Sequence, residues 1–79
     1  MEVKIYTTPS CPYCQMAKDF MKEKGVEFKE INVAQDQQAR EYMVQKSGQI
    51  GVPVIEKNSQ FAVGFNKPKL AELLGVEAD

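Results

Sequence analysis

The sequence has 79 residues, of which 43% are hydrophobic and 27% are charged, and its formal net charge is −1. A chain of this length has room for one domain, which we expect to span residues 1–79. Because acidic and basic side chains are interspersed and no apolar run approaches the thickness of a bilayer, we expect neither a nucleic-acid partner nor a membrane partner.

The first half of the chain predicts a strand, a helix and a second strand. Glu2 to Tyr6 alternates polar and apolar side chains, a pattern typical of a β-strand. From Pro12 to Lys24 apolar residues recur at helical spacing, with Ser10 as the expected N-cap and Gly25 as the residue that ends the helix. Val26 to Val33 is expected to form a second, less regular strand.

The second half predicts a helix, a hairpin and a last helix. Asp36 to Lys46 has helical periodicity, and a Ser-Gly pair follows as a stop. Val52 to Glu56 and Gln60 to Val63 are separated by a polar turn, which is the signal of a β-hairpin. A final helix is expected to be capped by Asn66 and to run through Leu74.

The elements therefore follow the order β-α-β-α-β-β-α. The first two strands are joined through a helix, so they should be parallel with a right-handed crossover, whereas the two strands of the hairpin should be antiparallel. This order predicts an α/β fold in which three helices cover both faces of a small, mixed, four-stranded sheet.

The two cysteines of the chain, Cys11 and Cys14, lie at the predicted start of the first helix, and three interpretations of the pair are open. A disulfide staple across so short a loop would stabilise little, because the entropic gain grows with loop length. A structural zinc site needs about four ligands, and two cysteines in a chain without histidine supply half of them. A redox-active pair is the interpretation that the position favours.

The start of a helix suits a redox-active cysteine because its positive end favours the thiolate, the nucleophile of disulfide exchange. Cys11 is expected at the exposed mouth of the helix, and Cys14, one turn further, is expected to be more buried and to react second. The N-terminus lacks the pattern of a secretory signal, so we expect a cytoplasmic location, where thiols stay reduced. Val52-Pro53 could initiate a strand or form a cis peptide bond, and the upstream cysteines favour cis.

Three stretches of the chain together resemble a glutaredoxin over nearly its whole length. They are Tyr6 to Cys14, which reads YTTPSCPYC, Gly51 to Val54, which reads GVPV, and Gly64 to Asn66. Within that family, the short clostridial-type glutaredoxin-like proteins are the most similar. The resemblance implies a thioredoxin fold and thiol–disulfide exchange with disulfide-containing proteins or glutathione. We expect a monomer without a bound cofactor or metal, with glutathione as co-substrate.

The same resemblance implies roles for individual residues. Cys11 matches the nucleophile of the family, and Cys14 matches the resolving thiol. Pro53 matches the cis-proline, and the residue before it offers its backbone groups to a bound peptide or to glutathione. The implied binding residues are Pro12, Tyr13, Val52, Pro53, Gly64, Phe65 and Asn66.

Departures from the family pattern leave the reductant open. Thr8 stands where many glutaredoxins have a lysine, and the segment Val63 to Lys67 lacks the carboxylate that meets the amino group of glutathione in the family. Lys67, or Lys46 and Arg40 on the second helix, could instead meet a glutathione carboxylate. The alternatives are a redoxin reduced by a thioredoxin-reductase-type flavoprotein and, as a non-catalytic role, an iron–sulfur or zinc carrier built across a dimer.

Overall fold

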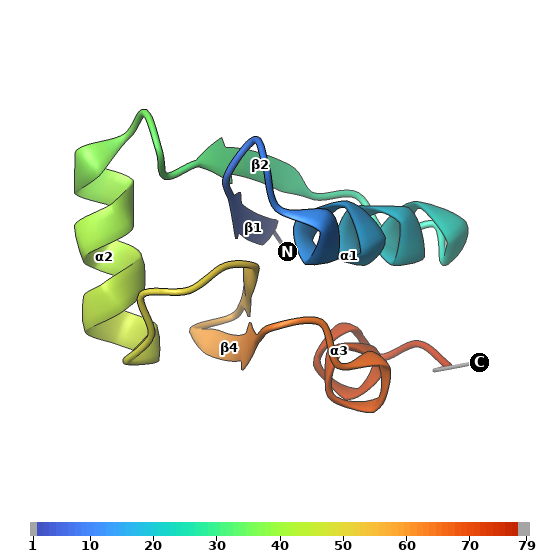
Figure 1. The fold of residues 1–79 in the computed structure, drawn as a ribbon. Helices are drawn as coiled ribbons and strands as arrows, with labels where there is room; N and C mark the ends of the chain where they lie inside the picture. Colours follow the sequence, from blue (N-terminus) through green and yellow to red (C-terminus); the bar gives the residue numbers. More distant parts are fainter. Residues whose placement is uncertain (1, 78–79) are drawn as a thin grey trace.

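The computed structural model describes residues 2–77, which form one four-stranded sheet with three helices (Figure 1). The elements are β1 (Val3–Thr7), α1 (Pro12–Glu23), β2 (Lys29–Asn32), α2 (Gln37–Ser47), β3 (Val54–Lys57), β4 (Gln60–Val63) and α3 (Lys67–Leu74). The strand order in the sheet is β2-β1-β3-β4, with β1 parallel to β2 and the other neighbouring pairs antiparallel. The predicted element order and the predicted mixed sheet are therefore confirmed. Within residues 2–77, no helix has both the length and the apolar character that crossing a membrane requires.

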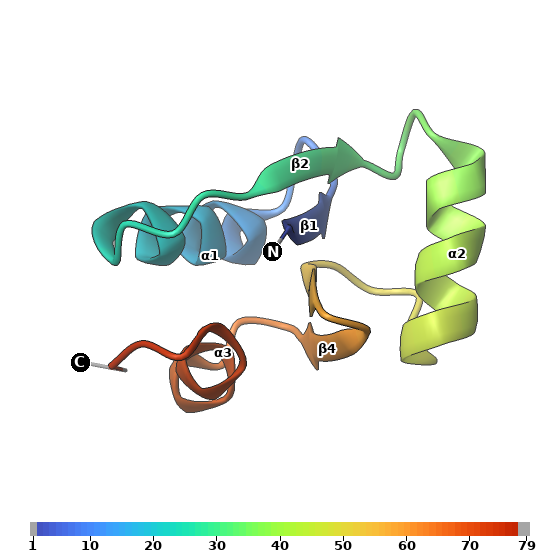
Figure 2. The same ribbon diagram turned by 180° about the vertical axis from the view of Figure 1, so that it is seen from behind.

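Helices cover both faces of the sheet. Figures 1 and 2 show α1 and α3 on one face and α2 alone on the other. Strand β1 contributes to both cores because its successive side chains point to opposite faces, with Ile5 in the first core and Tyr6 in the second. The first core contains Val3, Ile5, Ala17, Phe20, Met21, Ile55, Ala62, Leu70, Ala71 and Leu74. The second core is smaller and contains Tyr6, Val33, Met43 and Val54.

Three predicted boundaries are wrong, and one of them is the start of the third strand, which lies at Val54 and not at Val52 because Val52 and Pro53 are not paired with β1. The N-cap of α1 is Cys11 and not Ser10, because the sulfur of Cys11 accepts the backbone N–H of Cys14 at 3.1 Å. The second strand is limited to Lys29–Asn32, the residues that pair with β1, whereas the residues before it pack against the first core without joining the sheet. The extent of a strand depends on where backbone pairing with its neighbour starts and stops, and periodicity alone does not contain that information.

The attachment of α2 to the sheet combines one buried side chain with a polar anchor. Met43 is fully buried beneath the helix. Beside it, the carboxylate of Glu56 on β3 accepts a hydrogen bond from the hydroxyl of Tyr6 and another from the hydroxyl of Tyr42, each at 2.7 Å. Burial raises the pKa of Tyr6, and the hydrogen bond to Glu56 raises the pKa of Tyr42. Sequence patterns alone do not predict this arrangement of the three residues.

Candidate active site

The loop after β1 brings Cys11 to the N-terminus of α1. Cys11 is partly exposed and has extended dihedral angles, φ −101° and ψ 106°, as an N-cap residue does. Its sulfur accepts the N–H of Cys14 at 3.1 Å, one of the N–H groups that a helix leaves without an internal partner. Pro12 and Tyr13 follow it in the first turn and are exposed, Tyr13 to 59%. The sulfur therefore lies where a hydrogen bond and the helix dipole both stabilise negative charge.

Cys14 lies one turn into α1 and is buried, with 1% of its surface exposed. Burial is the main cause that raises the pKa of Cys14 to about 12, and the hydrogen bond with Cys11 acts in the same direction. A backbone hydrogen bond at Thr8 and the positive charge of Lys18 act against this rise. The predicted difference in burial between the two cysteines is confirmed, and Cys14 is a neutral thiol near neutral pH.

The loop before β3 places Val52 and Pro53 beside Cys11. The Val52–Pro53 peptide bond is cis, the form that the sequence analysis favoured. The Cys11 thiol donates a long hydrogen bond to the carbonyl oxygen of Val52, with 3.7 Å between sulfur and oxygen. Pro53 is buried, and its carbonyl oxygen accepts the N–H of Gly64 at 2.8 Å. Two segments that are distant in the sequence therefore meet at the partly exposed sulfur, and Gly64 is joined to the second of them through Pro53.

Phe65 and Asn66, also predicted to bind substrate, make structural contacts around the start of α3. The ring of Phe65 packs edge-on against Phe20, with 6.4 Å between the ring centroids. The side-chain oxygen of Asn66 accepts the N–H of Lys69 at 3.3 Å and so caps α3. The Asn66 oxygen is therefore already engaged within the chain, and the free donor of its side chain is the amide nitrogen.

A polar cluster of Lys18, Glu30 and Thr7 lies beside α1 and was not predicted from the sequence. Oε2 of Glu30, on β2, accepts the ammonium of Lys18 at 2.9 Å and the hydroxyl of Thr7 at 3.1 Å. The hydrogen bond from Lys18 holds the pKa of Glu30 below its usual range. Lys18 follows Cys14 by four residues, a spacing that was visible in the sequence. The partner on β2 depends on the parallel pairing of β1 and β2, which no local pattern reveals.

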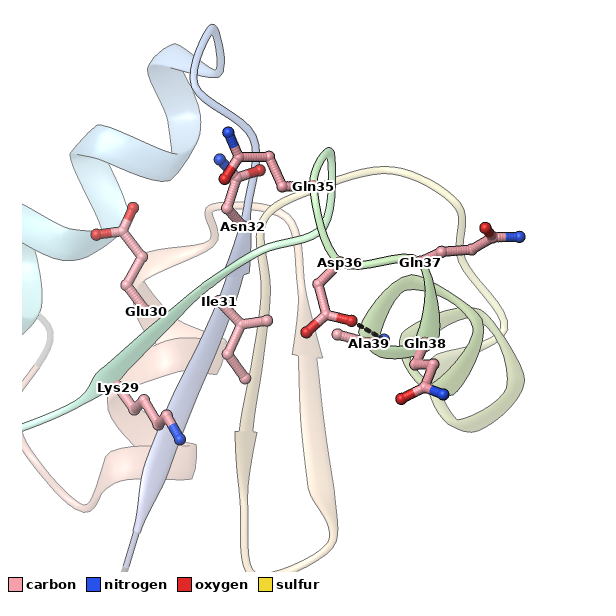
Figure 3. Close-up of a pocket in the computed structure, with 9 residues that line it drawn as sticks. All are labelled: Lys29, Glu30, Ile31, Asn32, Gln35, Asp36, Gln37, Gln38 and Ala39. Atoms are coloured by element: carbon pink, nitrogen blue, oxygen red, sulfur yellow. Dashed lines mark hydrogen bonds between the residues drawn. The ribbon is translucent and has the colours of Figure 1, made fainter.

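A groove of about 590 Å³ lies between the edge strand β2 and the start of α2 (Figure 3). Asp36 is engaged there as the N-cap of α2, because its Oδ1 accepts the N–H of Ala39 at 3.0 Å (Figure 3). Neither cysteine is part of this groove, so we do not place thiol chemistry in it. Its lining residues are Lys29, Glu30, Ile31, Asn32, Gln35, Asp36, Gln37, Gln38 and Ala39.

The described part of the chain does not assemble a metal site by itself. Within residues 2–77, no three side chains of the types Cys, His, Asp and Glu lie close enough together to hold a metal ion. A zinc or iron–sulfur site at Cys11 would therefore need thiols from a second chain or another molecule. The carrier role consequently depends on assembly with a partner.

Comparisons with known proteins agree with one another. The glutaredoxin family model matches residues 3–62. A glutaredoxin-like 8.6 kDa protein of the rubredoxin operon of Clostridium pasteurianum is 44% identical over 72 residues, which cover 91% of this chain and 96% of that protein. The solved glutaredoxin from Archaeoglobus fulgidus has a TM-score of 0.85 and 32% identity, covering 92% of this chain and 85% of its own.

The glutaredoxin-like NrdH-redoxin of Escherichia coli, a solved structure described as having a thioredoxin-like activity profile, is also similar. Its TM-score is 0.83 at 29% identity, covering 92% of this chain and 95% of its own. The structural matches confirm the predicted thioredoxin fold.

Proposed function

Because this chain belongs to the glutaredoxin family, a class of thiol oxidoreductases, we propose that it reduces disulfides of proteins or mixed disulfides of glutathione through its Cys11–Cys14 dithiol. The Cys11 thiolate attacks one sulfur of the substrate disulfide, and the other half of the substrate leaves as a thiolate that takes up a proton. Cys14 then loses its proton and attacks the Cys11 sulfur. The second half of the substrate leaves as a thiol, and the protein holds a disulfide. Two electrons pass from protein to substrate.

The observation that carries this proposal is the different position of the two sulfurs. Cys11 is accessible at the start of α1 and its sulfur accepts the Cys14 N–H at 3.1 Å, which favours attack on an external disulfide. Cys14 is 1% exposed and one turn away, so it reaches the mixed disulfide on Cys11 but not a substrate in solution. An accessible first thiol with a buried second thiol is the arrangement that two successive exchanges require.

The backbone beside Cys11 supports a substrate bound in extended form. The Val52 carbonyl oxygen lies 3.7 Å from the Cys11 sulfur, in the loop that leads into β3. A substrate strand laid along this loop would bind through main-chain groups and would need little side-chain specificity. Tyr13, exposed to 59%, would flank it with an aromatic face. Pro12 and Gly64 complete the proposed binding surface, and the buried Pro53 supports it from beneath by fixing the backbone of Val52.

Membership of the glutaredoxin family supports glutathione as the proposed reductant, whereas features of the surface support the alternative, a thioredoxin-reductase-type flavoprotein. In favour of the alternative, Asn66 has no carboxylate to offer and its oxygen caps α3. Lys67 lies in a groove of about 220 Å³ between α1 and the start of α3, which Asp19 and Glu23 also line. A carboxylate of glutathione brought to Lys67 would therefore meet two like charges. The similarity to NrdH-redoxin, described as thioredoxin-like in activity, supports the same alternative.

Turnover with two reducing systems tests the proposal. NADPH oxidation is followed with insulin as the disulfide substrate, once with glutathione and glutathione reductase and once with thioredoxin reductase. Turnover in at least one system, abolished by Cys11→Ser, is the expected result, and the faster system identifies the reductant. A Cys11→Ser variant with full activity would reject the nucleophile. A coloured, metal-bound dimer inactive in both systems would favour the carrier role.

A further inference from the structure

We propose that the ammonium of Lys18 stabilises the Cys14 thiolate during the second step of disulfide exchange. Glu30 holds the ammonium in place and Thr7 holds Glu30, which makes Lys18 a positioning residue for the resolving thiol. The inference rests on the proposed function, because it concerns the step in which Cys14 attacks the mixed disulfide on Cys11.

The second step needs Cys14 as a thiolate, and burial in the protein interior disfavours this negative charge. Cys14 is 1% exposed, and burial is the main reason that its pKa is raised to about 12. At neutral pH only a small fraction of this thiol is ionised, although the thiolate is the attacking species. When Cys11 is held in a mixed disulfide, it carries no charge. The remaining favourable influences on the Cys14 thiolate are the Thr8 backbone hydrogen bond and the charge of Lys18.

The position of Lys18 suits this role. Lys18 follows Cys14 by four residues in α1, so the two side chains share one face of the helix. Side chains in a helix lean toward its N-terminus, which directs Lys18 back over the turn that carries Cys14. The Lys18 side chain is 18% exposed, and a partly buried charge is screened less by water and salt than an exposed one.

Two residues from the sheet restrain the Lys18 ammonium: Glu30 binds it directly, and Thr7 fixes Glu30. Oε2 of Glu30 accepts a hydrogen bond from the Lys18 ammonium at 2.9 Å and another from the Thr7 hydroxyl at 3.1 Å. The second bond fixes the carboxylate. Figure 3 shows the Glu30 side chain at the border of the groove, pointing to the side on which α1 lies. Thr7 is 2% exposed and precedes Thr8, whose backbone bonds to Cys14. The cluster is therefore continuous with the loop that holds the dithiol.

The charged and polar side chains around the Lys18–Glu30 pair come from three elements, β1, β2 and α1. Strand β2 contributes Glu30, strand β1 contributes the uncharged Thr7, and α1 contributes Lys18 and Lys22. Lys22 lies one turn further from the thiols and is exposed, and it acts on Glu30 only through its charge. Lys22 therefore provides a matched control: it has the same charge on the same helix, but it makes no hydrogen bond to Glu30 and is not among the charges that act on Cys14.

The chemistry of the step is balanced without a further reagent. The Cys14 thiol releases its proton to solvent, and its sulfur attacks the Cys11 sulfur of the mixed disulfide. A Cys11–Cys14 bond forms while the bond from Cys11 to the substrate sulfur breaks. The substrate leaves as a thiolate and takes up a proton. Lys18 keeps its own proton throughout and acts through charge alone.

The experiment separates the two steps with dithiobis(nitrobenzoic acid), an aromatic disulfide that releases a coloured thiolate at each exchange. In stopped flow the first release depends on reagent concentration and reports attack by Cys11. The second release is independent of reagent concentration and reports attack by Cys14. The variants are Lys18→Met, Lys18→Gln, Lys18→Arg and the control Lys22→Met, each checked for folding by circular dichroism and urea unfolding.

Loss of the charge in Lys18→Met and Lys18→Gln is expected to slow the second release roughly threefold near pH 7. One pKa unit lowers the thiolate fraction about tenfold, and the greater nucleophilicity of a more basic thiolate returns part of the loss. The rise of this rate with pH should move to more alkaline values, and the first release should stay within about twofold. Lys18→Arg should restore most of the rate, and Lys22→Met should leave both releases unchanged.

Three results would overturn the inference: an unchanged second release in Lys18→Met and Lys18→Gln, an equal loss in Lys22→Met, or no recovery in Lys18→Arg. Failure of the proposed function looks different. It would appear in the unmodified protein as the release of a single thiolate, or as a second release that survives Cys14→Ser. Either of these would reject the dithiol mechanism before Lys18 is considered.

Discussion

The sulfur of Cys11 accepts the backbone N–H of Cys14 at 3.1 Å, so the two cysteines are linked through the first turn of α1 while both remain free thiols. The helix fixes this turn, and it therefore holds the second thiol close to the first without exposing it. Attack by Cys14 on a mixed disulfide at Cys11 is then an intramolecular reaction between preoriented groups, which lowers its entropic cost.

Alkylation should distinguish the two thiols. Brief treatment of the folded, reduced protein with iodoacetamide near neutral pH is expected to label Cys11 and to spare Cys14, because Cys14 is 1% exposed and its pKa is raised to about 12. Mass spectrometry of the digested protein locates the label. In urea both cysteines should react, and Cys11→Ser should remain unlabelled when folded. Equal labelling of the two thiols in the folded protein would contradict the structure.

Burial of Cys14 predicts a loss of stability in alkali. The pKa of Cys14 rises from 9.0 to about 12 on folding, so the unfolded chain releases this proton first as the pH increases. The contribution to stability is complete below about pH 9 and is lost progressively between about pH 9 and pH 12, at up to about 1.4 kcal/mol per pH unit.

Urea unfolding under reducing conditions, near pH 8 and near pH 10, checks this prediction. The free energy of unfolding of the unmodified protein should fall by about 1.4 kcal/mol more than that of Cys14→Ala over this interval. The comparison cancels the contribution of Tyr6, whose raised pKa also lowers stability in alkali. Equal losses in the two proteins would show that Cys14 does not titrate as its burial requires.

The carboxylate of Glu56 should couple the two tyrosines that bind it. Tyr6→Phe removes a buried hydrogen bond to the carboxylate and should cost about 1.5–3 kcal/mol, whereas Tyr42→Phe should cost about 1 kcal/mol because this ring is 37% exposed. The double variant should cost more than the sum, since Glu56 then loses both hydroxyl donors. Urea unfolding measures all three values, and strict additivity would contradict the shared carboxylate.

The order of the elements was predictable because it depends on local signals. Gly25 and Gly48 stop their helices with φ angles of 71° and 74°, conformations that favour glycine. Asn66 caps α3 as its residue type suggested. Ser10 was preferred as the first cap for the same reason, but the chain uses the sulfur of Cys11 instead. A statistical preference for serine cannot anticipate a functional thiol in the same role.

The features of the site that depend on spacing along the sequence were predictable. Two cysteines at a helix start and a Val-Pro pair before a strand identified the thiols and the adjacent cis bond. The ion pair between Lys18 and Glu30 was not predictable, because it joins elements brought together by strand pairing. The burial of Glu56 was indicated only weakly by the sequence: Glu56 follows Val54 by two residues in a strand and therefore lies on the same buried face. A carboxylate on that face requires hydrogen-bond donors from elsewhere in the fold.

Residue 66 offers a direct test of the reductant. Asn66 caps α3 through its side-chain oxygen, at 3.3 Å from the N–H of Lys69. Aspartate is an equally good N-cap, and its negative charge is favoured at the start of a helix. Asn66→Asp should therefore fold with unchanged or slightly higher stability. It also supplies the carboxylate that, by resemblance to other glutaredoxins, meets the amino group of glutathione.

If glutathione occupies this surface, kcat/KM with glutathione and glutathione reductase should rise about fivefold in Asn66→Asp, the effect of an exposed ion pair of about 1 kcal/mol. The rate with thioredoxin reductase should not change, because the amino group of glutathione takes no part in that reaction. Asn66→Ser, which keeps a capping oxygen without charge, is the matched control and should leave the glutathione rate unchanged. A glutathione rate that stays the same in Asn66→Asp would place glutathione elsewhere and would favour the flavoprotein as the electron donor.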